Sequence, residues 1–263
     1  MTSADRVAEA AGIVLAGGRS TRMGTPKAAL EWHGSTLLAR ITGLLGRTVA
    51  GPVVVARAPG QVLPALPGAV EVVDDPTPGQ GPMHGIASGL DAVGERAPRA
   101  FVCSTDLPLL HPAYIRAVLA RLGDGVDVVM PQVHGHPQPL AAGYRTAVAA
   151  HLHELIAAGR TRPARDLTQL RVVRPGEDEL LTDPALATAD PQLDSVRNVN
   201  RPEEYRELRD RPAPEVTVLT GDGPVRVRAA TRGAAAAAVG AIVPDPEGPL
   251  VPGDVLDLRP SLT

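Results

Sequence analysis

This chain contains a single lysine, Lys27, and its other permanently cationic side chains are arginines. Of the 26 lysine and arginine residues, only this one is a lysine. It closes the segment Leu15-Ala16-Gly17-Gly18-Arg19-Ser20-Thr21-Arg22-Met23-Gly24-Thr25-Pro26-Lys27. An ammonium group is a compact point charge that fits between phosphate oxygens, whereas a guanidinium group is a planar fork. A lone lysine at the end of a glycine-rich loop therefore indicates a binding site for an anion such as a phosphate.

Two adjacent glycines, Gly17 and Gly18, begin this loop directly after an apolar run. Because they lack a Cβ, their amides can approach a ligand closely, and consecutive amides in a turn form a nest for an anion. Arg19 or Arg22 would add a second charge around the same space. The spacing matches neither the P-loop nor the dinucleotide-binding glycine pattern. The loop is therefore a candidate phosphate site of another kind.

An aspartate ends a second apolar run, Phe101-Val102-Cys103-Ser104-Thr105-Asp106-Leu107-Pro108. If this run is a strand, the carboxylate of Asp106 lies at the edge of the sheet. Magnesium takes one or two protein carboxylates and completes its shell with phosphates and water. Asp106 is thus a candidate metal ligand, and the alternative is that it caps the following helix.

The elements that must position these residues alternate between strands and helices. Apolar runs predict buried strands, and helical patterns lie between them. The expected strands are 12–16, 52–56, 100–104 and 126–131, and the expected helices are 36–45, 85–93, 112–122 and 146–158. This alternation predicts an α/β fold of three layers, with a doubly wound, mostly parallel, Rossmann-like sheet.

In such sheets, ligands bind beyond the carboxyl ends of the strands. The polar or glycine-rich stretches 17–27, 74–85 and 104–108 each follow an expected strand. We therefore expect these three stretches to meet in one crevice.

The composition changes after Asp210. Residues 1–210 are expected to form the main domain, and residues 211–214, Arg-Pro-Ala-Pro, to form a linker. Residues 215–263 are then a small α+β module of unknown role, which we call the C-terminal module. Its expected parts are a hairpin around Gly221-Asp222-Gly223, an alanine-rich helix and a last strand.

Charge and composition limit the partners of the chain. A formal net charge of −3 gives no general attraction to nucleic acid or to an anionic membrane. The one cysteine, Cys103, rules out an internal disulfide and fits a reducing compartment. The longest apolar run, 233–244, is too short to span a bilayer, and the first residues lack the pattern of a signal peptide. We therefore expect a cytoplasmic protein with no nucleic-acid partner and no membrane partner.

On these residues the chain resembles the molybdenum cofactor guanylyltransferases, which are MobA-like NTP transferases. The loop from Leu15 to Lys27 is similar to their signature, Leu-Ala-Gly-Gly-x-Ser-x-Arg-Met-Gly-x-x-Lys, which wraps the nucleoside triphosphate. The resemblance implies a nucleotidyltransferase fold and a nucleotide site at this loop. It places Leu15, Ala16, Gly17, Gly18 and Lys27 on the nucleotide, and assigns Lys27 and Arg22 to catalysis.

Two further segments resemble the nucleotide side of this family. Residues 74–86 contain Gly81-Pro82-Met83-His84-Gly85-Ile86 and are similar to a family segment that contributes to nucleotide binding. The family aspartate before it is Asp74 or Asp75, and the spacing leaves both open. The alternative is a turn followed by an amphipathic helix. The resemblance also makes Asp106 a catalytic residue that binds the nucleotide through Mg²⁺, the implied cofactor.

Two more segments resemble the acceptor side. Gln138-Pro139-Leu140-Ala141-Ala142-Gly143-Tyr144 is similar to one family motif, and the stretch with Asn198 and Asn200 is similar to another, whose asparagines contact the pterin substrate. Each amide supplies both a donor and an acceptor, as the edge of a pterin requires. The resemblance thus implies an acceptor site of Arg22, Gln138, Asn198 and Asn200. The asparagines could instead simply begin the helix 202–209.

The function implied by the resemblance is transfer of GMP from GTP to the phosphate of molybdopterin, with release of pyrophosphate. Catalysis would rest on positioning and on neutralisation of charge by Lys27, Arg22 and Asp106. The implied partners are GTP and molybdopterin or the molybdenum cofactor. A molybdoenzyme or a cofactor-delivery protein is a further candidate partner.

Two alternatives stay open at this stage. Pro26 is typical of the cytidylyltransferases that mature the same cofactor with CTP. Gly17, the pair Asn198 and Asn200, and the segment Gly-Pro-Met-x-Gly-Ile at 81–86 favour the guanylyltransferases. Arg57 stands where the family often has an asparagine near the base, which bears on the choice of nucleotide. The C-terminal module suggests the second alternative, a non-catalytic nucleotide-binding adaptor of the same fold.

Overall fold

The computed structural model describes residues 6–17, 26–77, 79–167 and 169–259. Its centre is a seven-stranded sheet in the order β11-β7-β10-β6-β1-β4-β5. These strands are β1 (Ala10–Leu15), β4 (Val53–Arg57), β5 (Val70–Asp74), β6 (Arg99–Ser104), β7 (Val128–Val129), β10 (Ala141–Arg145) and β11 (Val172–Val173). Strand β10 runs antiparallel to both of its neighbours, whereas the other pairings are parallel.

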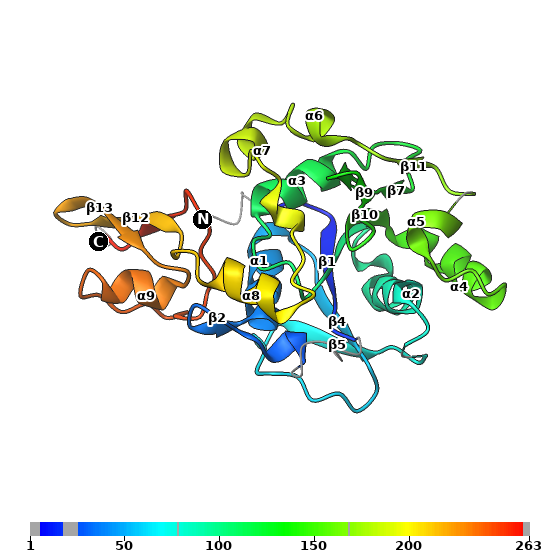
Figure 1. The fold of residues 1–263 in the computed structure, drawn as a ribbon, viewed down its shortest axis with the longest axis horizontal. Coiled ribbons are helices and arrows are strands. Elements are labelled where there is room, and N and C mark those ends of the chain that lie inside the picture. The colour runs from blue at the N-terminus through cyan, green and yellow to red at the C-terminus, as the bar shows by residue number, and fades with distance from the viewer. Residues whose placement is uncertain (1–5, 18–25, 78, 168, 260–263) are drawn as a thin grey trace.

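Helices cover both faces of this sheet (Figure 1). Helices α1 (Leu37–Thr48) and α3 (Pro112–Ala120) share one buried cluster with Val14, Val55 and Phe101. Helices α2 (Pro82–Val93) and α4 (Ala149–Ala157) share the other cluster with Ile13 and Val54. Neighbouring strand residues therefore point into different clusters, as a sheet buried on both faces requires. The predicted three-layer, doubly wound α/β fold is confirmed.

Short elements complete the main domain. A 3-10 turn (Lys27–Ala29) leads into the hairpin β2 (Glu31–Trp32) and β3 (Ser35–Thr36), and a second hairpin consists of β8 (Gln132–Val133) and β9 (His136–Pro137). The remaining elements are the 3-10 turns Gly94–Arg96, Thr146–Val148 and Asp194–Val196, and the helices α5 (Pro163–Asp166), α6 (Glu177–Leu180), α7 (Pro184–Ala189) and α8 (Pro202–Arg209). Within the described ranges, no helix combines the length and the apolar character that crossing a membrane requires.

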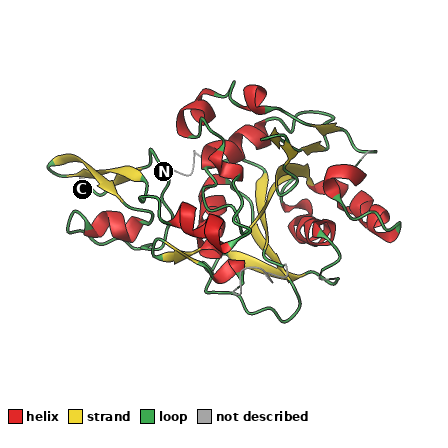
Figure 2. Ribbon diagram, in the orientation of Figure 1, coloured by secondary structure: helices red, strands yellow, loops and turns green. Residues whose placement is uncertain are grey.

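The C-terminal module forms a separate three-stranded sheet beside the main domain (Figure 2). Its order is β13-β12-β14, from β12 (Glu215–Thr220), β13 (Gly223–Arg228) and β14 (Val255–Asp257). Helix α9 (Arg232–Ala237) begins after Thr231, whose side chain accepts a hydrogen bond from the Ala234 amide, as an N-cap residue does. Val216, Val218 and Ala235 lie in a buried cluster of the module itself.

Candidate functional site

A cavity of about 410 Å³ opens at the carboxyl ends of β1, β4, β5 and β6. Its walls come from these strand ends, from the 3-10 turn after β1 and from the start of α2. The lining residues are Leu15, Ala16, Gly17, Lys27, Ala56, Ala58, Asp75, Gly79, Gly81, Pro82, Gly85, Ser104, Thr105, Asp106 and Leu140. The described parts of the three stretches expected to converge therefore share one crevice, where a doubly wound sheet binds its ligand.

The polar centre of this crevice is the ammonium group of Lys27. Its Nζ lies 2.7 Å from Asp106 Oδ2 and 2.8 Å from Asn200 Oδ1. The side chains of Lys27 and Asp106 are 19% and 14% exposed, so this ion pair is only partly shielded from solvent. One cation thus joins the loop after β6 to the segment before α8, although these residues are distant in the sequence.

Each partner of this contact is held by its own element. Pro26 precedes the 3-10 turn, and its carbonyl accepts a hydrogen bond from the Ala29 amide at 2.9 Å. The Ser104 hydroxyl donates to Asp106 Oδ1. The Val199 amide donates to the Asp106 carbonyl at 3.0 Å, and this bond fixes the Asp106 backbone against the segment that carries Asn200.

The two candidate aspartates after β5 have different surroundings. Asp75 is buried and lines the cavity, and its Oδ1 accepts a hydrogen bond from the Thr77 amide at 2.9 Å. Asp74 is not among the lining residues, and its Oδ1 lies 2.8 Å from Nε of Arg57. Arg57 is thereby engaged in an ion pair with Asp74.

Glycine is required where the loop before α2 enters the cavity. Gly81 has a φ of +111°, in a region that side chains other than glycine rarely adopt. A Cβ at this position would lie 3.1 Å from the carbonyl oxygen of Thr161. The chain therefore passes close to the loop before α5 at the cavity wall, and the Gly81 backbone is open to a ligand.

The expected acceptor residues are arranged less uniformly. None of Gln138, Asn198 and Asn200 is among the lining residues, but Asn200 contacts the lining residue Lys27. The side-chain Nε2 of Gln138 donates to the carbonyls of Val133 at 3.3 Å and His136 at 3.2 Å, so this side chain closes the β8–β9 hairpin. Asn198 is exposed to solvent. Gly18 and Arg22 lie outside the described residues.

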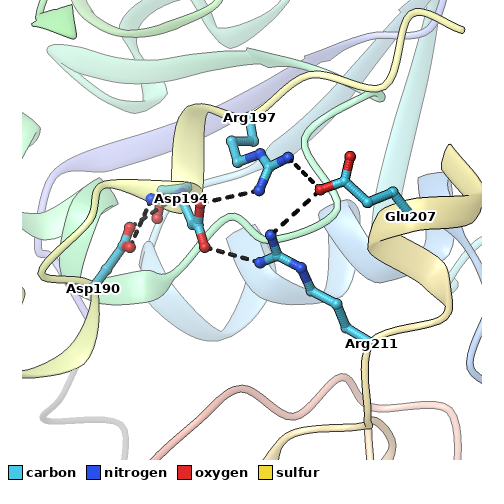
Figure 3. Close-up of polar contacts among 6 residues, drawn as sticks. Asp190, Asp194, Arg197, Glu207 and Arg211 are labelled. Atoms are coloured by element: carbon cyan, nitrogen blue, oxygen red, sulfur yellow. Dashed lines mark hydrogen bonds and ion pairs between the residues drawn. The ribbon is translucent and has the colours of Figure 1, made fainter. Parts of the chain in front are cut away.

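A network of charged side chains fixes both ends of the segment that carries the two asparagines (Figure 3). Arg197 Nη2 lies 2.9 Å from Glu207 Oε1, and Arg211 Nη1 lies 3.0 Å from Asp194 Oδ2. Asp190 accepts the amides of Asp194 at 2.7 Å and Ser195 at 2.9 Å. These contacts join the 3-10 turn Asp194–Val196, α8 and residue 211 into one unit. The position of Asn200 is therefore set by the fold.

Some contacts around the cavity were not predicted from the sequence. Ser104 belongs to the stretch 104–108 that was expected to reach the crevice, but its hydrogen bond to Asp106 was not predicted. Gln61 has no comparable sequence signal: its Nε2 donates to the Ala16 carbonyl at 2.9 Å, and its Oε1 accepts from the Ala58 amide at 3.1 Å. This side chain therefore links two lining residues, Ala16 and Ala58, from a loop. Leu140, which also lines the cavity, lies in the turn before β10.

The donors present suit a weakly held divalent cation that shares its shell with a substrate. Among the residues that the structure describes, no group of three or more histidine, cysteine, aspartate or glutamate side chains could hold a metal ion. Asp106 offers one carboxylate in the cavity, beside Ser104 and Thr105. Cys103 is fully buried, and this burial raises the pKa of its thiol well above the usual value, so it does not act as a ligand or a nucleophile.

Comparison with known proteins agrees with this geometry. Residues 12–174 match the family described as the MobA-like NTP transferase domain. A protein of Mycobacterium bovis named "probable molybdenum cofactor guanylyltransferase" is 43% identical over 156 residues, which cover 58% of this chain and 76% of that protein. One of the same name from Chloroflexus aggregans is 35% identical over 201 residues, or 74% of this chain and 91% of that protein.

A solved structure gives the same fold. Molybdopterin-guanine dinucleotide biosynthesis protein A from Archaeoglobus fulgidus superposes with a TM-score of 0.59 at 22% identity. The match covers 76% of this chain and 97% of that chain. At this identity the likeness concerns the fold alone.

Proposed function

The chain belongs to the family of MobA-like NTP transferases, and from this premise we propose that it is a molybdenum cofactor guanylyltransferase. It transfers GMP from GTP to the phosphate of molybdopterin or of the molybdenum cofactor. The observation that carries the proposal is the contact of Lys27 with Asp106 and Asn200, in a chain whose relatives at 35–43% identity are named for this activity. No covalent enzyme intermediate is needed.

The reaction is a displacement at the α-phosphorus of GTP. An oxygen of the acceptor's terminal phosphate forms a bond to this phosphorus, and the bond from the α-phosphorus to the α,β-bridging oxygen breaks. Pyrophosphate leaves with the electron pair of that bond. Because negative charge gathers on the leaving group and around the α-phosphate, the protein accelerates the step mainly by positioning and by charge neutralisation.

The residues of the cavity divide this work. Gly17 and Lys27 line the part of the cavity that we assign to the triphosphate, and we assign Gly18 and Arg22 to the same loop site. Asp75 and Gly81 belong to the wall that receives the nucleoside. The residues present fit Mg²⁺, since Asp106 supplies the single carboxylate that the ion needs beside phosphates and water. When bound, Mg²⁺ supplies positive charge to the donor phosphates.

The acceptor side begins at Asn200. In the structure its Oδ1 receives a hydrogen bond from Lys27, so the amide lies directly beside the cation that the donor phosphates require. Asn198 stands two residues away on the same segment, and its exposed amide is available to a pterin edge. We assign both asparagines, Gln138 and Arg22 to the acceptor. A downstream molybdoenzyme or delivery protein would receive the product.

The choice of nucleotide is a separate part of the proposal. Gly17 and the pair Asn198 and Asn200 favour GTP, whereas Pro26 favours CTP. Arg57 forms an ion pair with Asp74, and neither residue is among the residues that line the cavity. GTP is accordingly the proposed donor, and CTP is the second candidate.

The test measures pyrophosphate release by the full chain with Mg²⁺ and a molybdopterin acceptor, with GTP, CTP, ATP or UTP as donor. Release with GTP at a rate at least tenfold above the other nucleotides is the expected result. Asp106→Asn removes the carboxylate charge and should abolish this release. Asp74→Asn is the matched control, because Asp74 has the same chemistry but does not line the cavity.

Three outcomes would overturn parts of the proposal. Preference for CTP would assign the chain to the cytidylyltransferases. Equal rates with Asp106→Asn and the unmodified chain would remove Asp106 from the reaction. Binding of GTP without pyrophosphate release, by folded protein with acceptor present, would show the non-catalytic adaptor.

A further inference from the structure

The C-terminal module packs directly on α1, the helix that follows the Lys27 turn and the β2–β3 hairpin. A Cβ on Gly43 would lie 2.6 Å from the Cδ atom of Pro249, so this glycine permits a close approach. Arg47 Nη1 lies 2.7 Å from Asp254 Oδ2, one turn further along the helix. Val251 is 2% exposed and belongs to the buried cluster under the main sheet. The module is therefore part of the core packing.

One side chain connects this contact to the loop of Asp106. Arg40 lies on α1 one turn before Gly43 and is 5% exposed. Its Nε donates to the Pro108 carbonyl at 2.8 Å, and its Nη1 donates to the Leu250 carbonyl of the C-terminal module at 3.1 Å. Burial lowers the pKa of Arg40 to about 10, so the guanidinium remains charged at neutral pH.

The geometry of the guanidinium suits a bridge between two backbone segments. Its donors lie in one plane at fixed angles, so two acceptors are held at a defined separation. Pro108 follows Asp106 by two residues, in the turn that leads to α3. The carbonyl that Arg40 holds is therefore close, along the chain, to the carboxylate of the cavity. If the Leu250 carbonyl moved, Arg40 would move with it, and the Pro108 carbonyl in this turn would lose or change its hydrogen bond.

The same turn contacts the module at a second point. The Ala113 amide donates to Nδ1 of His111 at 3.1 Å, so Nδ1 is an acceptor. The proton of the neutral ring then lies on Nε2, which faces the Pro252 carbonyl at 3.3 Å. The His111 amide also donates to Ser195 Oγ at 3.0 Å. Residues 105–111, which we call the Asp106 loop, are thus supported at Pro108 and at His111 by residues outside the main sheet.

We propose that Arg40 is a positioning residue for the transfer reaction, and that the C-terminal module holds Arg40 in place through the Leu250 carbonyl. The module thereby fixes the Asp106 loop, although none of its residues 215–259 lines the cavity. The kinetic part of this inference rests on the proposed function. The structural part, that the module orders the loop, does not depend on which nucleotide reacts.

The test introduces one methyl group between the module and α1. Gly43→Ala places a Cβ against the rigid ring of Pro249 and so displaces the module. Gly46→Ala is the matched control. Gly46 lies on the same helix, and a Cβ at this position would have no neighbouring atom within 4 Å. Both substitutions bring the same gain in helix propensity. A difference between them therefore reports the contact with the module.

Two readouts separate positioning from stability. Hydrogen exchange of the full chain without nucleotide should be faster at amides of the Asp106 loop in Gly43→Ala, and unchanged in Gly46→Ala. In pyrophosphate release, Gly43→Ala should lower kcat by about 10- to 100-fold, since small misplacements of reacting groups cost this much. Its KM for GTP should stay within about threefold, because Asp75 and Gly81, which we assign to the nucleoside, lie on the cavity wall before α2 and not on the Asp106 loop.

The side chain itself is tested with Arg40→Lys and Arg40→Met. Lysine keeps the charge but cannot span both carbonyls, so we expect both variants to lower kcat and to speed exchange in the Asp106 loop. Equal exchange and equal kcat for Gly43→Ala and Gly46→Ala would overturn the inference. So would Arg40 variants that unfold at lower temperature while keeping the full kcat. If the unmodified chain released no pyrophosphate, the proposed function would fail, and the exchange result would still decide the role of the module.

Discussion

Replacement of Lys27 by alanine should impair catalysis while leaving the fold almost unchanged. The substitution removes the cation that lies 2.7 Å from Asp106 and 2.8 Å from Asn200. Both of these partners lie at or beside the cavity, and the 3-10 turn keeps its own backbone hydrogen bonds. The effects on turnover and on stability can therefore be compared directly.

The expected loss of turnover is large. Removing one charged group that stabilises developing negative charge costs on the order of 10²- to 10³-fold, or about 2.7–4 kcal/mol. A Coulomb estimate for two unit charges about 4 Å apart near a protein surface, about 4 kcal/mol, has the same size. We therefore expect Lys27→Ala to lower kcat by at least about 100-fold.

The expected loss of stability is much smaller. Exposed ion pairs contribute about 0–1 kcal/mol, and breaking a fully buried pair costs about 3–5 kcal/mol. Lys27 and Asp106 are 19% and 14% exposed and face an open cavity, where water can replace the ammonium group. The Asp106 carboxylate also keeps the Ser104 hydroxyl. We expect a loss of about 1 kcal/mol, which lowers Tm by about 2–4 °C.

The assay is pyrophosphate release at saturating GTP, beside thermal unfolding of the same preparations. Lys27→Arg is the control, since it keeps the positive charge and replaces the compact ammonium by a planar fork. We expect it to bind GTP but to remain at least tenfold slower than the unmodified chain. Turnover of Lys27→Ala within threefold of the unmodified chain would refute the assignment of Lys27 and, with it, the reasoning from its contacts.

Three further predictions follow from burial and from the cavity lining. Asp75→Asn should weaken GTP binding about tenfold in a fluorescence titration, whereas Asp74→Asn should leave it within twofold, because only Asp75 lines the cavity. Cys103 should not react with a thiol reagent in the native chain and should react after denaturation, because burial raises the pKa of its thiol. Burial lowers the pKa of His111 below its usual 6.5, so the unfolded chain binds this proton more tightly. Its contribution to stability is therefore present above about pH 6.5 and lost as the pH falls through the folded pKa, and the difference in Tm between pH 7.5 and pH 5 should shrink in His111→Asn.

The sequence predicted the fold and the crevice well, because both follow from local patterns. The apolar runs of β1, β4 and β6 are continuous, and the glycines and aspartates that follow them occur where strands end. Lys27 and Asp106 were recognised from their types and spacing, and they lie 2.7 Å apart. The rule that ligands bind at the carboxyl ends of parallel strands was sufficient to bring them together.

Strand β10 shows where this reasoning fails. Residues 138–144 were assigned to the acceptor side and not to a strand, yet Ala141–Arg145 inserts antiparallel between β6 and β7. Its small residues give no strong strand signal, and its pairing with Phe101 and Val102 is a contact between distant parts of the chain. The expected strand 126–131 shrinks to Val128–Val129, since β10 and β11 take only these residues into the sheet.

Side-chain contacts between distant segments of the fold could also not be predicted from the sequence. No pattern near Gln61 indicates that its amide would brace the Ala16 carbonyl. Likewise, nothing around Arg40 shows that its guanidinium would join Pro108 to Leu250. Leu250 lies 210 residues after Arg40 in the chain. Such contacts depend on how the elements pack, and packing brings together residues whose spacing in the sequence carries no information about their distance.

The structure gives a physical reason for a lysine at position 27 in a chain that otherwise uses arginine. An ammonium group directs three donors tetrahedrally from one atom, and here the same Nζ reaches Asp106 and Asn200 from two different segments. A guanidinium directs its donors in a plane from three nitrogens, which suits two acceptors on one group better than acceptors that converge from separate directions. The proposed reaction adds phosphate oxygens to this same point, between the donor-side carboxylate and the acceptor-side amide. A compact cation can exchange one oxygen partner for another there with small movements, and this requirement selects lysine.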